Sequence, residues 1–141
     1  MRNKTLYGLV LLATFMSLGH HVDHVLRGNH TGWPLTPEPT PFTYSFGFYP
    51  LIAVGLYLYK KERVGAGFWA VLTAVGILFV GLAHFGPLAA EPPADILNPY
   101  ESAIAGWLAL SWLVAFLLVL GTITIYGTYV WAHEPREQPD N

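Results

Sequence analysis

The residues best suited to chemistry are crowded into one short stretch. Five consecutive residues beginning at His20 include three histidines and one aspartate, and Arg27 and His30 follow closely. An α-helix turns about 100° per residue, so the face that carries His20 and His24 also carries Asp23. Two imidazoles at positions i and i+4 lie one turn apart, which is the spacing used by helical metal motifs.

A further histidine, His84, ends a later apolar segment that is expected to run in the same direction as the first. The histidines at the two segment ends should therefore share one depth. Three neutral imidazoles with a carboxylate suit zinc, iron or copper, and Asp23 is expected either to bind the metal or to orient an imidazole. His30 is expected to complete the site from the following loop. The predicted metal ligands are His20, His24, His84, Asp23 and His30.

Other interpretations of the same residues remain open. Haem b held by His84 and one histidine of the first helix is a variant of the metal hypothesis. Without a metal, Asp23 and His24 are a candidate acid–base pair for a reaction on a lipid. Asp23 and Arg27, also at i and i+4, are equally well explained as an ion pair. A non-enzymatic accessory or ion-handling subunit is the remaining alternative.

The composition is that of a membrane protein. Of the 141 residues, 53% are apolar and only 11% are charged. A net charge of −2 with seven basic residues leaves no basic patch, so nucleic acid is excluded as a partner. There is no cysteine, which excludes disulfides, thiolate metal sites and cysteine nucleophiles. The expected partners are membrane lipid and, because the chain is small, further copies of itself or a larger membrane complex.

The apolar residues fall into four segments of a length that can span a bilayer. They cover approximately 5–25, 42–59, 65–85 and 103–132. The sequence therefore predicts an all-α protein, a single-domain four-helix up-down bundle in the membrane over 1–141. Pro50 should kink the second segment unless it lies in the first turn of a helix.

Basic residues predict the orientation of the bundle. Lys4, Lys60 and Lys61 lie at one end of the segments, whereas the loops at the other end are rich in proline and poor in lysine and arginine. The positive-inside rule then places both termini in the cytoplasm, in what is expected to be the cell (inner) membrane. A less favoured interpretation of the first segment is a signal peptide cleaved after Gly19.

Polar residues at the starts of the second and fourth predicted segments have structural explanations. Asn98 and Glu101, with Pro99 between them, match the start of a helix closed by a capping box. Tyr44, Ser45 and Tyr49 are able to donate hydrogen bonds toward the histidines, although an aromatic belt at the membrane surface explains the tyrosines more simply. His133 lies beyond the last segment, at the opposite end from the histidine cluster.

Overall fold

The computed structural model describes residues 3–28 and 39–134, and all regular structure in these residues is helical. The helices are α1 (Lys4–Arg27), α2 (Pro41–Ser45), α3 (Phe48–Lys60), α4 (Ala66–Phe85), α5 (Pro93–Leu97) and α6 (Ala103–Ala132). The all-α prediction is confirmed. The predicted segments coincide closely with α1, α4 and α6.

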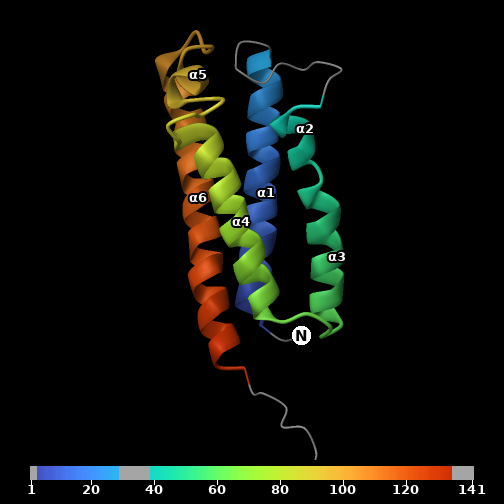
Figure 1. Cartoon of the computed structure of the whole chain (residues 1–141). Coiled ribbons are helices and arrows are strands. Elements are labelled where there is room, and N and C mark those ends of the chain that lie inside the picture. Colours follow the sequence, from blue (N-terminus) through green and yellow to red (C-terminus); the bar gives the residue numbers. More distant parts are fainter. Residues whose placement is uncertain (1–2, 29–38, 135–141) are drawn as a thin grey trace, which may run out of the picture.

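The long helices form an up-down bundle (Figure 1). In Figure 1, α1 and α4 run in one direction and α6 in the other, while α2 and α3 follow each other back along α1. The closest packing is between α4 and α6, and then between α1 and α6, whereas α3 approaches α1 at few points. Helix α6 thus packs closely against both α1 and α4, whereas α3 lies more loosely beside α1.

Three of the helices, α1, α4 and α6, are long and apolar enough to cross a membrane, judged by length and composition. Their outward faces carry large apolar side chains, such as Leu78 on α4 and Ile125 on α6, which are 65% and 75% exposed. Helices that are apolar on the outside as well as the inside are typical of proteins surrounded by lipid.

The second predicted segment differs from the prediction, because it is divided between α2 and α3 at Phe46 and Gly47. Pro50 explains the division. In a continuous helix its ring would clash with the carbonyl of Phe46, four residues earlier. In the structure Pro50 instead lies in the first turn of α3, where a missing N–H removes no helical hydrogen bond. With 13 residues, α3 is shorter than the other three long helices.

The chain is also turned sharply at the end of the bundle where the histidines lie. Gly28 caps α1 with a φ of 60°, a left-handed value that favours glycine, and its N–H bonds back to His24 and Val25. The segment after α4 folds back as well, since the Glu91 N–H donates to the carbonyl of Ala83 at 3.1 Å. Short helix α5 then covers this end of the bundle (Figure 1).

The capping box predicted at Asn98 and Glu101 is wrong, although the predicted 103–132 segment matches α6. Asn98 caps the C-terminal end of α5, where its N–H bonds to Ala94, and α6 begins at Ala103 after Ser102. Because Asn98 ends α5, it does not serve as the N-cap of α6. Glu101 is exposed and takes part in no capping box in the structure.

Candidate metal centre

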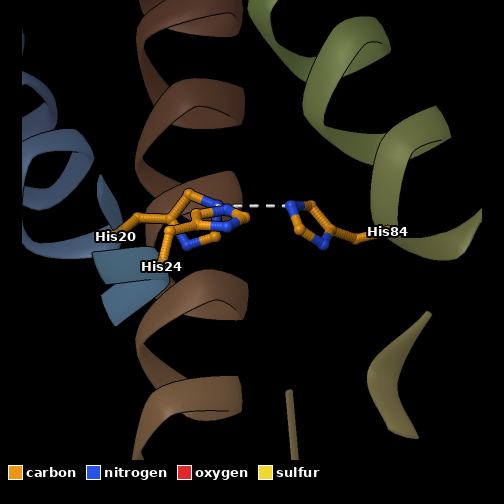
Figure 2. A group of neighbouring side chains, drawn as sticks. All are labelled: His20, His24 and His84. Atoms are coloured by element: carbon orange, nitrogen blue, oxygen red, sulfur yellow. Dashed lines mark hydrogen bonds between the residues drawn. The ribbon is translucent and has the colours of Figure 1, made fainter. Parts of the chain in front are cut away.

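Three buried imidazoles meet between α1 and α4. The Nε2 atom of His20 lies 3.2 Å from Nε2 of His24 and 3.2 Å from Nε2 of His84. One nitrogen from each ring can be chosen so that all three lie within 4.8 Å of one another. Figure 2 shows His20 and His24 extending from α1 toward His84 on α4. None of the three side chains is more than 6% exposed.

Two features of the sequence bring the rings together. His20 and His24 are one helical turn apart on the face of α1 that packs inward, in line with the buried Met16 and Ala13. His84 lies in the last turn of α4, which runs parallel to α1 and ends at the same end of the bundle (Figure 1). The three histidines therefore arrive at one depth from two helices.

The convergence of three Nε2 atoms has a direct chemical consequence. A neutral imidazole carries a proton on only one nitrogen, so the Nε2 of His20 cannot donate to both of the other nitrogens. A cation between the rings satisfies all three lone pairs at once. Nitrogens bound tetrahedrally to zinc at 2.0–2.1 Å are separated by about 3.3 Å, close to the two distances found here.

Glu91 is the residue of this cluster that the sequence interpretation missed. Its side chain is fully buried, and its Oε2 lies 3.3 Å from Nε2 of His24 and 3.2 Å from Nδ1 of His84. The backbone carbonyl of Glu91 also accepts from Nδ1 of His84 at 3.0 Å. A proton on Nδ1 leaves the lone pair of Nε2 directed at the other imidazoles, so Glu91 orients His84 as carboxylates commonly orient metal-binding histidines.

A buried ion network adjoins the histidines. Arg27, which is 2% exposed, donates to the carboxylate of Glu91 and to the backbone carbonyl of Asp95, and pairs with Asp23 at 2.8 Å. The phenol of Tyr100 donates to the other oxygen of Asp23. Burial, and then the contact with Asp23, raise the pKa of Tyr100 to about 12, so the phenol keeps the proton that it donates. The ion pair expected between Asp23 and Arg27 is therefore present.

The remaining predicted residues lie in different places. His21 faces another side of α1, where it bonds to Ser45 at 2.6 Å and to the phenol of Tyr49 at 2.8 Å, while Tyr44 is exposed. These contacts hold α2 and α3 against α1 instead of extending the triad. His30 lies outside the described residues. His133 caps the opposite end of α6.

A cavity of about 90 Å³ extends from the three histidines into the bundle. The imidazoles close one end, and Val10, Trp69 and Ile123 line the other. Most of its lining is apolar.

Comparisons with known proteins give no family for this chain. No model of a protein family matches it, and no curated protein or solved structure matches it at a significant level.

Proposed function

We propose that this chain is a small membrane protein that binds a transition metal ion through His20, His24 and His84. The observation that carries the proposal is that Nε2 of His24 and Nε2 of His84 each lie 3.2 Å from Nε2 of His20, close to the separation of ligands in a tetrahedral metal site, with one nitrogen of each buried ring within 4.8 Å of the others. Zinc, iron and copper all accept imidazole ligands of this kind.

The charges around the imidazoles support a cation. Arg27 contributes one positive charge, while Asp23 and Glu91 contribute two negative charges, so the network has a formal charge of −1. Uncompensated negative charge is costly away from water, so the network favours a cation beside it. Glu91 is near enough to become a fourth ligand through Oε2 or to remain the group that orients His84.

An ion fits these dimensions better than haem b. When two imidazoles bind haem iron, they stand on opposite faces of the macrocycle. If each Fe–N bond is as long as other metal–imidazole bonds, the two ligating nitrogens are about 4 Å apart. Here the nitrogens are 3.2 Å apart, and the adjoining cavity of about 90 Å³ is far smaller than a porphyrin.

Three protein ligands are the pattern of catalytic metal sites, which keep a position for water or substrate. A metal held here would polarise an oxygen of a bound substrate or activate water. The cavity that opens from the imidazoles is mostly apolar, so the substrate class that it favours is a lipid or another apolar molecule.

We place the metal centre near the extracytoplasmic face of the inner membrane. Lys60, Lys61 and Arg63 lie at the turn between α3 and α4, the end opposite to the histidines. At the histidine end, Arg27 is held in buried ion pairs, so it belongs to the site and not to a basic loop. The positive-inside rule then favours cytoplasmic termini.

Metal analysis of the purified protein tests the proposal. Wild-type protein supplied with zinc, iron and copper is expected to retain close to one equivalent of metal after dialysis. His84→Ala should lower this at least tenfold, because it removes one of three ligands. His21→Ala is the matched control, since His21 is on the same helix but bonds to Ser45 and Tyr49. Equal metal content in all three proteins would contradict the proposal.

A second candidate function rests on the contact between His24 and Glu91. At 3.3 Å these groups can act as an acid–base pair for a proton shift on a lipid without a metal. This role is better suited to Glu91 than to Asp23, which is engaged by Arg27 and Tyr100. Folded wild-type protein that contains no metal after metal supplementation would favour this function.

A further inference from the structure

A groove lies on the outer surface of the bundle between α3 and α4. Its volume is about 670 Å³, within the range of about 300–1,000 Å³ that is typical of pockets for small organic molecules. On α4 the lining residues Gly67, Val71 and Val75 recur at every turn, so the groove follows the axis of this helix. A lipid chain beside a helix that crosses a bilayer runs along the same axis.

The walls of the groove are almost entirely apolar and face outward. Leu51 on α3 and Val71 on α4 line it and are 43% and 58% exposed. Trp131, near the end of α6, lines the same groove and is also exposed. The backbones of α3 and α4 approach each other at few points, so neither helix fills the space between them. Such a surface favours the apolar part of a lipid over water.

Exposed basic residues lie where the groove reaches one end of the bundle. Helices α3 and α4 are joined at this end (Figure 1), and the junction carries Lys60, Lys61 and Arg63, all of which are exposed. It leads directly to Gly65, which lines the groove. Among the residues that the structure describes, none forms a salt bridge with these three bases. Their charge is therefore available to a ligand at the mouth of the groove.

The charges at this end fit a head group with one negative charge. Glu62 and Glu134 are the acidic residues of the junction and the groove, and Glu134 accepts from the N–H of Ala66 at 3.4 Å. Together with the three bases they give a formal charge of +1. Phosphatidylglycerol carries one negative charge and restores neutrality, whereas zwitterionic phosphatidylcholine does not. Each basic residue beside a membrane helix raises the affinity for an anionic lipid by about fivefold.

We propose that the groove between α3 and α4 binds an anionic phospholipid, with one acyl chain along α4 and the phosphodiester at Lys60, Lys61 and Arg63. The groove ends at the opposite end of the bundle from the histidines, so this site is separate from the proposed metal centre and does not depend on it. With the orientation proposed above, the lipid comes from the cytoplasmic leaflet.

Native mass spectrometry of the full-length protein tests the proposal. The protein in mild detergent is mixed with equal amounts of dipalmitoyl phosphatidylglycerol and dipalmitoyl phosphatidylcholine, whose acyl chains are identical. We expect one phosphatidylglycerol to be retained, with at least a tenfold preference over phosphatidylcholine. Equal retention of the two lipids would overturn the proposal.

Two single substitutions test the contact with the head group. Arg63→Gln removes the base nearest along the chain to Gly65 and should lower the preference for phosphatidylglycerol about fivefold. Lys4→Gln is the matched control, because Lys4 is exposed at the same end of the bundle but lies on α1, outside the groove. It should leave the preference unchanged. An equal loss in both variants would indicate attraction by the whole basic end and would contradict a site in the groove.

Two substitutions on α4 test the position of the chain. Val71→Trp places a large side chain in the groove and should lower the retained phosphatidylglycerol at least tenfold. Leu78→Trp is the control, because Leu78 is similarly exposed on the same helix and does not line the groove. Equal retention by the two variants would count against the groove. A dimer that only Val71→Trp abolishes, in protein that retains no phosphatidylglycerol, would assign the groove to a second copy of the chain and overturn the lipid site.

Discussion

Glu91 connects the histidine cluster to the buried ion network of Arg27. One oxygen of its carboxylate faces His24 and His84, and the other accepts from Arg27. The carboxylate thereby contacts two imidazoles of the proposed metal centre and neutralises a buried guanidinium. Loss of its charge should affect both metal affinity and the stability of the fold.

Substitution Glu91→Gln keeps the volume of the side chain and removes its charge. We expect metal affinity to fall about 10- to 100-fold, as is usual when a carboxylate behind a metal-binding histidine is lost. The free energy of unfolding should fall by about 3 kcal/mol, since Arg27 remains buried with fewer negative partners. Metal titration and denaturant unfolding in detergent measure the two effects.

The matched control is Glu101→Gln, which removes an exposed carboxylate at the same end of the bundle. It should change neither quantity. If both variants behave like wild type, Glu91 has neither of the roles assigned to it.

Sequence spacing predicted which histidines share a face, but it did not predict Glu91. The i, i+4 relation of His20 and His24 is a local property of a helix, and the direction of α4 followed from counting segments. Glu91 reaches the histidines only because the chain folds back after α4, with its N–H bonded to Ala83. A single carboxylate in a proline-rich loop carries no periodic signal of such a turn.

At the level of elements, the site depends on how closely α1 packs against α6. Gly19, one residue before His20, lies beneath the indole of Trp112, whose Nε1 donates to the carbonyl of Met16 at 2.9 Å. A Cβ at Gly19 would lie 2.7 to 2.8 Å from three atoms of the indole. This position therefore requires glycine if the two helices are to keep their separation.

Substitution Gly19→Ala should lower the free energy of unfolding by about 1 to 3 kcal/mol, because the added methyl group overpacks the contact with Trp112. Gly8→Ala, on the same helix, is the control. A Cβ at Gly8 meets nothing within 4 Å, so alanine should be neutral or should stabilise the helix by about 0.5 to 1 kcal/mol. Thermal unfolding of both variants in detergent makes the comparison. An equal effect of the two substitutions would contradict the close packing of α1 and α6.

Helix prediction succeeded where apolar runs were long and failed where short elements or proline intervened. The predicted 103–132 segment coincides with α6, and no charged residue interrupts its apolar run. By contrast, α5 has only five residues, and the role of Asn98 depends on whether α5 forms before it. Pro50 correctly predicted a break in the second segment. The position of the break follows from the carbonyl of Phe46, with which the proline ring would clash in a continuous helix.

In the whole molecule, the proposed orientation places the histidines near the extracytoplasmic face. Lys61 is exposed at the turn between α3 and α4, and Leu88, at the histidine end, is 94% exposed. Because the chain contains no cysteine, one introduced thiol reports one position without background.

A membrane-impermeant maleimide added to intact cells should label Leu88→Cys and leave Lys61→Cys unlabelled until the membrane is opened. Each variant serves as the control for the other. The reverse pattern would place the metal centre at the cytoplasmic face and would contradict the orientation derived from the basic residues.

We propose that one metal ion is bound by three imidazoles. X-ray absorption spectroscopy of the metal-loaded protein is the decisive measurement, because it reports the type, number and distance of the ligands. We expect three imidazole nitrogens at about 2.0 to 2.1 Å for zinc, and one fewer in His84→Ala. A ligand shell made only of oxygen, or an identical spectrum in wild type and His84→Ala, would contradict the claim.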